Sequence, residues 1–136
     1  MIKPMVDHLM VQQQIKAPHK IWKHMVGVMC LNLTYRKQVK IILPKLFERY
    51  PNPQAYLRGR LKTQQEILKP LGMWEVRSKR IRKMTEQYLT WDRKEASDLH
   101  GIGKYGSDSY QIFFHNHIPP NVQDKELRKY IDNLVE

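Results

Sequence analysis

The segment Leu99-His100-Gly101-Ile102-Gly103-Lys104-Tyr105-Gly106 carries two glycines two positions apart, directly before a helix-like run at residues 107–115. Glycine permits sharp backbone turns, and without a Cβ it leaves nearby peptide N–H groups uncovered. Such groups, backed by the start of a helix, form a cradle for an anion. We therefore expect a tight interhelical turn here with a phosphate as its natural occupant. A glycine pair alone is also compatible with an ordinary turn.

Helical periodicity dominates the sequence around this turn. Apolar residues recur at positions i, i+3 and i+4 in three segments, residues 39–50, 81–88 and 127–134. Pro44 falls inside the first segment, which predicts either a kink there or a helix that begins near it. Proline and glycine punctuate the chain at residues 51–53, 69–72, 101–103 and 119–120. Alternating, β-branched segments are scarce, so the pattern predicts an all-α protein of seven to nine short helices.

The length and composition suit one compact domain, and we expect residues 1–136 to form it. The chain has 136 residues, 41% of them apolar, which is enough to bury a core. Its formal net charge of +11 favours a polyanionic partner or an anionic membrane surface. No run approaches the roughly 18 apolar residues of a membrane span, and the N-terminus lacks the apolar segment of a secretory signal. An intracellular, monomeric protein is the expectation.

The positive charge is concentrated in the segment from Leu57 to Lys83. Nine basic residues stand there against Glu66 and Glu75, a net charge of +7. The basic residues are Arg58, Arg60, Lys62, Lys69, Arg77, Lys79, Arg80, Arg82 and Lys83. Such a run is often only a solvated helix face. Its concentration around the turn at residues 69–73 favours a phosphate-facing surface.

Cysteine and histidine usage argues against a metal centre. A single cysteine, Cys30, rules out an intrachain disulfide and a four-cysteine zinc or iron–sulfur site, and it is expected to be a small buried apolar residue. His115 and His117 are close enough in sequence to share a metal, but they lack clear carboxylate partners. We therefore expect no metal site and no cofactor; a cation bound at the glycine turn stays open.

The glycine turn resembles the hairpin of the helix-hairpin-helix DNA glycosylase superfamily, the group that includes endonuclease III. In that family an aspartate follows the hairpin by one helix and a loop, and Asp124 stands in that place. The resemblance is closer to the branch of the methyl-CpG-binding thymine glycosylases, whose hairpin, wedge loop and catalytic segment are similar to residues 99–110, 68–72 and 124–132. It extends from about Gln14 to the C-terminus.

The resemblance implies a fold of two small helical lobes with the active site in the cleft between them. The hairpin would span about residues 96–115, and the N- and C-terminal segments together would form the second lobe. It also implies double-stranded DNA as partner and the hydrolytic removal of a flipped, mismatched or damaged pyrimidine, such as thymine, uracil or a 5-substituted uracil opposite guanine, in base excision repair.

The resemblance assigns roles to individual residues. Asp124 would be catalytic, because a carboxylate stabilises the positive charge that builds on the sugar and orients the attacking water. Asp124 is also a good N-cap for a helix beginning near Lys125, and the two roles are compatible. Tyr105 and Gln14 would line the base pocket, and Met73 would be the wedge that fills the gap left by the base. Phosphate binding would fall to Gly101, Gly103, Lys104 and Gly106.

Three positions depart from the family pattern. Bifunctional members carry a Schiff-base lysine directly after the hairpin, where this chain has Tyr105; Lys104 is one residue away and should point elsewhere. We therefore expect no lyase activity at abasic sites. Leu33 replaces an arginine, for which Arg36 is a candidate substitute, and Glu126 replaces a lysine. These two changes put the preference for thymine opposite guanine in doubt.

Other functions are compatible with parts of this sequence. A glycosylase-like enzyme that modifies a hypermodified pyrimidine in DNA would keep an acidic residue in the same pocket. A non-catalytic helix-hairpin-helix module would need the hairpin but not Asp124, Tyr105 or a wedge after Gly72. A membrane-binding protein fits least, because the basic stretch lacks a strong lipid-facing apolar stripe.

Overall fold

The computed structural model describes residues 18–132, and every regular element in that range is helical. In chain order these are α2 (Lys20–Leu31), α3 (Arg36–Arg49), α4 (Pro53–Arg58), α5 (Leu61–Leu68), the 3₁₀ helix η1 (Lys69–Leu71), α6 (Trp74–Tyr88), the 3₁₀ helix η2 (Ala96–Asp98), α7 (Lys104–His115) and α8 (Lys125–Asp132). The predicted all-α class is therefore confirmed.

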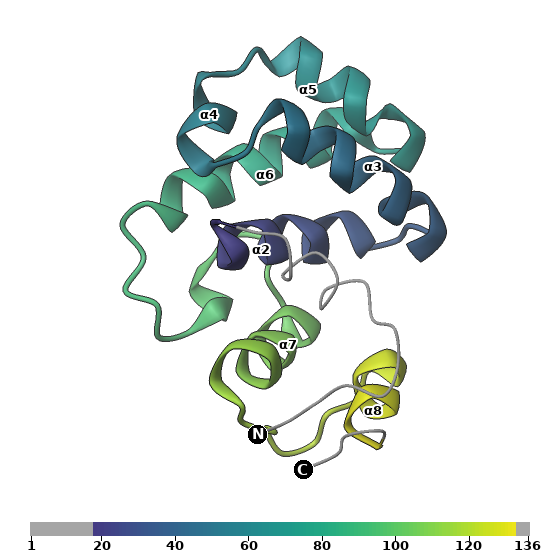
Figure 1. Ribbon diagram of the computed structural model, residues 1–136, viewed down its shortest axis with the longest axis vertical. Coiled ribbons are helices and arrows are strands. Elements are labelled where there is room, and N and C mark those ends of the chain that lie inside the picture. The colour runs from purple at the N-terminus through teal and green to yellow at the C-terminus, as the bar shows by residue number, and fades with distance from the viewer. Residues whose placement is uncertain (1–17, 133–136) are drawn as a thin grey trace.

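Helix α2 lies between two groups of helices. On one side α3, α4, α5 and α6 pack together as the larger lobe, and on the other side lie α7 and α8 (Figure 1). Within the described range, the smaller lobe therefore consists of the C-terminal helices. The part of that lobe expected from the N-terminal segment lies outside the described residues.

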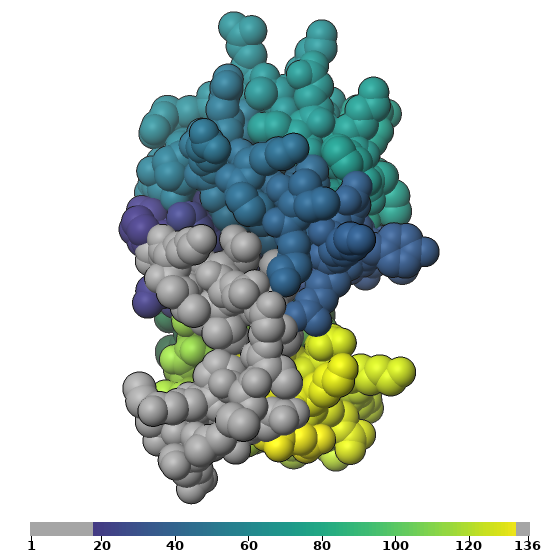
Figure 2. Space-filling model, turned by 45° about the vertical axis from the view of Figure 1, so that its right-hand side comes forward, coloured from purple at the N-terminus to yellow at the C-terminus, as the bar shows by residue number. Residues whose placement is uncertain are grey.

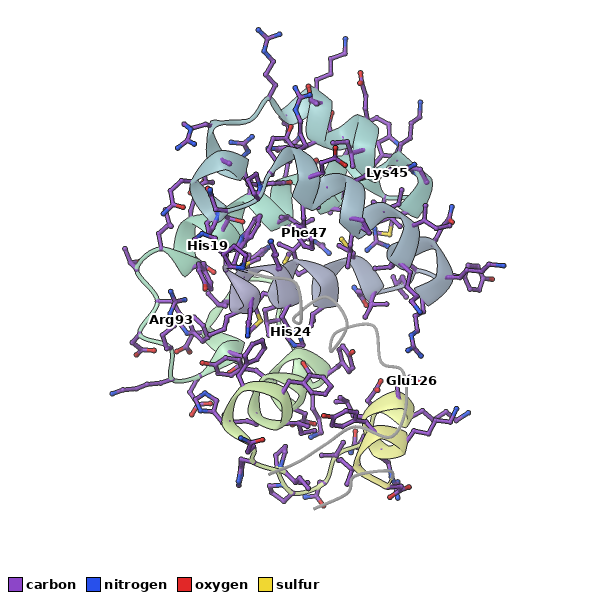
Figure 3. All side chains as sticks on the ribbon, in the orientation of Figure 1. His19, His24, Lys45, Phe47, Arg93 and Glu126 are labelled. Atoms are coloured by element: carbon purple, nitrogen blue, oxygen red, sulfur yellow. The ribbon has the colours of Figure 1, made fainter. Side chains whose placement is uncertain are left out.

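Side chains on opposite faces of α2 attach it to both lobes. Trp22 is fully buried and its indole N–H donates to the Thr85 hydroxyl of α6 at 3.0 Å. His24 points from α2 towards α7 (Figure 3), where its Nε2 lies 2.8 Å from Ser109 Oγ. Because both polar contacts are buried, they fix the position of α2 more tightly than apolar packing alone would. Cys30 is buried on the same helix, as expected, and burial raises the pKa of its thiol to about 12.

The helical pattern that begins at Val39 is confirmed. The side chains of Val39, Ile42, Leu43, Leu46 and Phe47 are all buried on the inner face of α3. Of the two alternatives at Pro44, a helix start is wrong, because α3 begins at Arg36 and Pro44 lies on its exposed side.

The basic segment between Leu57 and Lys83 divides into internal and surface residues. Arg77 is 7% exposed and donates to the carbonyls of Gly72, Met29 and Cys30 and to Thr34 Oγ1. Arg82 donates to the carbonyls of Leu57 and Gly59 and to Gln64 Oε1. The expectation of one phosphate-facing surface is therefore wrong for these two arginines, which stabilise backbone carbonyls inside the larger lobe.

Helix α8 is fastened to α7 by a small apolar cluster of its own. Leu127 and Tyr130 of α8 pack with Ile112 of α7, and the Tyr130 ring meets Phe113 edge to face with centroids 4.8 Å apart. The first turn of α8, which carries Asp124 as its cap, is thereby brought close to Tyr105 at the start of α7.

None of the helices in the described part of the chain has the length and apolar character of a membrane span.

Candidate active site

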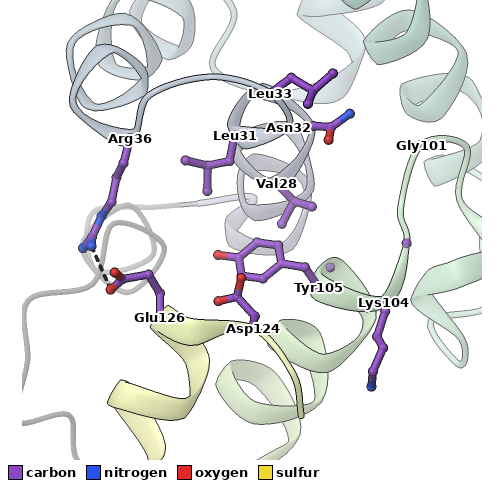
Figure 4. Close-up of a pocket in the computed structure, with 12 residues that line it drawn as sticks. Val28, Leu31, Asn32, Leu33, Arg36, Gly101, Lys104, Tyr105, Asp124 and Glu126 are labelled. Atoms are coloured by element: carbon purple, nitrogen blue, oxygen red, sulfur yellow. Dashed lines mark hydrogen bonds and ion pairs between the residues drawn. The ribbon is translucent and has the colours of Figure 1, made fainter. Parts of the chain in front are cut away.

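A cavity of about 530 Å³ lies where α2, α3, the glycine turn, α7 and α8 meet. Its volume falls in the range of pockets that hold small organic molecules. Val28 and Leu31 give it an apolar wall from α2, and Tyr105 and Asp124 face it from α7 and the cap of α8 (Figure 4). The structure thus brings the predicted residues Gly101, Gly103, Lys104, Tyr105, Gly106 and Asp124 to the lining of one pocket.

Asp124 is held in place by the helix that it caps. Its Oδ2 accepts a hydrogen bond from the Leu127 N–H at 3.0 Å, and its carbonyl accepts one from the Arg128 N–H at 3.0 Å. The expected N-cap is therefore confirmed. The positive end of the helix stabilises the charged carboxylate, and only one of its oxygens is used by the cap. Asp124 also lines the pocket, as a catalytic role would require.

Tyr105 lies across the pocket from α2, with its hydroxyl directed towards the first turn of α8 (Figure 4). Burial raises the pKa of this hydroxyl, the nearby Asp124 carboxylate raises it further, and the Arg36 guanidinium opposes the shift. Tyr105 is therefore a neutral hydrogen-bonding group with an aromatic face, at the position where a lysine nucleophile would otherwise stand. Its role as a wall of a base pocket stays a prediction.

The glycine turn has the backbone geometry that its sequence predicts. Gly101 adopts φ +80°, which a residue with a side chain rarely adopts, and a Cβ there would lie 2.8 Å from Met29 Cε. Gly103 is the N-cap of α7, and a Cβ there would meet nothing within 4 Å. Gly103 is thus not needed for packing, which leaves its exposed backbone open to a ligand.

Basic residues of α6 lie beside this turn. Partial burial lowers the pKa of His100, and the positive charges of Lys83 and Arg80 lower it further. Arg80 lines the same small cavity as Gly101, and the His100 N–H donates to Gln87 Oε1 of α6, so α6 packs beside the glycine turn. This face of α6 supplies exposed positive charge next to the turn, unlike Arg77 and Arg82.

Gly106 and Lys104, two of the four residues predicted to bind phosphate, make other contacts in the structure. Gly106 is buried in the first turns of α7, where a Cβ would lie 2.7 Å from Ile102 Cγ2 and 3.0 Å from Val28 Cγ1. Its missing side chain permits close packing of α7 on α2, a role that the sequence did not predict. Lys104 points away from Tyr105 (Figure 4), and its ammonium pairs with Asp108 at 2.9 Å. The orientation expected for Lys104 is confirmed; its contact with phosphate stays a prediction.

Met73 projects from the surface close to the pocket. It is 52% exposed and caps α6 in the left-handed conformation, with φ +47°. A second cavity of about 90 Å³ adjoins Met73 and shares Asn32 and Gly101 with the larger one. The Met73 side chain could therefore insert into a ligand that is bound beside the pocket, as a wedge must do. Gln14, the other predicted pocket residue, lies outside the described residues.

Two charged residues of the pocket form a pair that the sequence did not predict. Arg36 of α3 and Glu126 of α8 form an ion pair with Nη1 and Oε2 3.1 Å apart, although 90 positions separate them (Figure 4). The sequence marked Arg36 only as a candidate substitute for the arginine replaced by Leu33, and Glu126 only as a departure from the family pattern. Within residues 18–132, no three histidine, cysteine or acidic side chains gather in a way that could hold a metal ion.

Sequence comparisons identify relatives of this chain among known proteins. The chain is 30% identical over 119 residues to a methyl-CpG-binding domain protein 4-like protein of Arabidopsis thaliana, a match covering 85% of this chain and 26% of that protein. It is 29% identical over 93 residues to a thymine/uracil-DNA glycosylase of Pyrobaculum aerophilum, covering 63% and 40%. A thymine-DNA glycosylase of Aeropyrum pernix is 25% identical over 91 residues, covering 62% and 41%. The chain therefore spans less than half the length of these relatives.

Solved structures show the same fold. A non-covalent endonuclease III–DNA complex superposes with a TM-score of 0.62 at 17% identity, covering 74% of this chain and 49% of that one. A trapped covalent endonuclease III–DNA intermediate gives a TM-score of 0.59 at 19% identity, covering 69% and 46%. At these identities the likeness concerns the fold. No family model matches the sequence.

Proposed function

Because the chain belongs to the helix-hairpin-helix superfamily of DNA glycosylases, we propose that it hydrolyses the glycosidic bond of a flipped pyrimidine in duplex DNA. One observation carries the proposal above the others. Asp124 and Tyr105 both line a cavity of about 530 Å³, and Gly101 and Gly103 belong to the same lining. The site thus combines a carboxylate, an aromatic ring and a glycine turn of the kind that suits an anion.

Asp124 supplies the chemistry of bond cleavage. As the bond between base and sugar lengthens, positive charge builds on the sugar, and a fixed carboxylate close to it stabilises that charge. The oxygen of Asp124 that the Leu127 N–H does not occupy also orients and deprotonates the attacking water. Because α8 holds the carboxylate before the substrate arrives, little reorganisation is needed during the reaction.

Tyr105 sets the type of reaction. A lysine at this position would attack the sugar and form a Schiff base, which leads to strand cleavage. A neutral tyrosine hydroxyl cannot do so, and the Lys104 ammonium is engaged with Asp108 at 2.9 Å. Water is then the nucleophile, and the products are a free base and an abasic site in an intact strand.

Met73 and the glycine turn account for base flipping and DNA binding. Extruding a base costs a few kcal/mol of lost stacking, and an apolar side chain inserted in its place recovers part of it. Met73 is exposed, unbranched and next to the pocket. The peptide N–H groups around Gly103, with Arg80 and Lys83 nearby, would hold the phosphates of the DNA backbone.

The substrate we propose is thymine, uracil or a 5-substituted uracil opposite guanine, within base excision repair. The similarity to a thymine/uracil-DNA glycosylase and to a thymine-DNA glycosylase supports the pyrimidine class. Leu33 stands 81% exposed at the rim where the resembling branch carries an arginine, so we expect a weaker preference for the base opposite the lesion.

The test is an excision assay with duplexes that carry each candidate lesion opposite guanine or adenine. After incubation, half of each sample is heated in alkali to break abasic sites. We expect strand breaks only in the alkali-treated half, and only for pyrimidine lesions. Breaks without alkali would refute the hydrolytic mechanism, and the absence of breaks in every duplex would refute glycosylase activity.

A further inference from the structure

Helix α8 carries two carboxylates in its cap and first turn, and both line the pocket. Asp124 caps the helix and Glu126 lies two residues later. Figure 3 shows Glu126 at the end of α8 that faces the larger lobe. Two carboxylates in one pocket raise the question of which one acts on the substrate and what the other does.

The Arg36–Glu126 ion pair answers that question. Its donor comes from α3 in the larger lobe and its acceptor from α8 in the smaller lobe, with 3.1 Å between Nη1 and Oε2. The two side chains are 34% and 43% exposed, so the pair closes one side of the pocket without being sealed from water. The surfaces of α3 and α8 approach each other there (Figure 2). The charge of Glu126 is thus paired with a cation, whereas the Asp124 carboxylate is held by a backbone N–H.

The pair also acts on Asp124 through the helix. The apolar cluster around Leu127 and Tyr130 attaches α8 to α7. The Arg36 contact lies on the first turn, close to the cap. Movement of that turn would move the Leu127 N–H that holds the Asp124 carboxylate. Misplacing a catalytic group by about 1 Å costs on the order of a hundredfold in rate.

We propose that Arg36 and Glu126 are positioning residues, whose ion pair ties the first turn of α8 to the larger lobe and so holds Asp124 against the sugar of the flipped nucleotide. The proposal rests on the proposed function for its catalytic part. It assigns the pair to the bond-breaking step and not to DNA affinity.

The experiment compares Arg36→Gln, Glu126→Gln and the charge-exchanged double variant Arg36→Glu/Glu126→Arg. Excision is measured in single turnover with saturating protein, and DNA affinity by titration. Each single variant should lose about tenfold to a hundredfold in excision rate with little change in affinity, and the double variant should recover most of the rate. Lys37→Gln and Glu48→Gln make the same charge changes at exposed positions of α3 and should leave the rate unchanged.

A second readout does not depend on activity. The amide protons of Leu127 and Arg128 bond to Asp124, so their hydrogen exchange, followed by NMR, reports how firmly the cap is held. Exchange should be faster in both single variants and slow again in the double variant. If the wild-type protein excises no base, the proposed function fails. The same exchange pattern would still support the structural part of the proposal, that the Arg36–Glu126 ion pair holds the first turn of α8. Unchanged rate and exchange in Glu126→Gln, or a double variant no better than the singles, would overturn the proposal.

Discussion

The carboxylate of Asp124 accepts the backbone N–H of Leu127 at 3.0 Å, so the candidate catalytic group is also the N-cap of the helix behind it. One side chain therefore has a structural and a chemical role. The two are separable, because an asparagine caps a helix as well as an aspartate does but cannot carry the negative charge.

Asp124→Asn should keep the stability of the protein and lose its activity. We expect excision to fall by about a hundredfold to ten-thousandfold, with DNA affinity retained. Asp124→Ala should lose the same activity and, in addition, about 1 kcal/mol of stability as the cap is removed. Single-turnover excision and thermal unfolding of both variants provide the check. Full activity in Asp124→Asn would show that another group activates the water.

The two glycines around the start of α7 should respond in opposite ways to alanine. Gly103→Ala places a Cβ in open space, so stability should hold while DNA affinity falls as the phosphate loses its close approach. Gly106→Ala forces a Cβ against Ile102 and Val28, and should cost about 1–3 kcal/mol of stability. Chemical denaturation and DNA titration distinguish the two. Equal affinity in Gly103→Ala and wild type would remove the turn from the DNA interface.

Met73→Ala should affect excision from duplex DNA and not from single-stranded DNA. The side chain is 52% exposed, so its truncation should change stability by less than about 0.5 kcal/mol. A duplex lesion needs the wedge to offset lost stacking, and we expect its excision to slow by about tenfold or more. A lesion in a single strand is already unstacked and should react at the wild-type rate. The same loss on both substrates would contradict the wedge.

The protein should lose stability as pH rises above about 10. Burial raises the pKa of Tyr56 and of Tyr105, so the folded state holds these protons more tightly than the unfolded chain does. Their contribution is complete below the pKa of an unfolded tyrosine and declines above it, by up to about 1.4 kcal/mol per pH unit for each group. Denaturation series across this range should show the decline, and Tyr105→Phe should make it shallower. An identical slope in that variant would contradict the assignment.

Much of the fold was predictable from residue spacing, because helical periodicity and glycine turns are local properties. The apolar repeat that begins at Val39 and the turn at Gly101–Gly103 appear in the structure where the sequence placed them. Arg77 shows where prediction from neighbouring residues fails. Its neighbours in sequence suggested a charged surface, whereas Gly72, Met29 and Thr34 surround its guanidinium in space.

The sequence by itself determined the helical class, the sharp turn before α7 and the capping residue of α8, since each depends on a few consecutive residues. The tertiary structure brings Asp124 and Tyr105 to one pocket, as the resemblance implied, and it alone decided that Gly106 serves packing and that Arg36 meets Glu126. These relationships join α2, α3, α7 and α8, which are far apart along the chain. They depend on how α2 is packed between the two lobes, and no short spacing in the sequence records that arrangement.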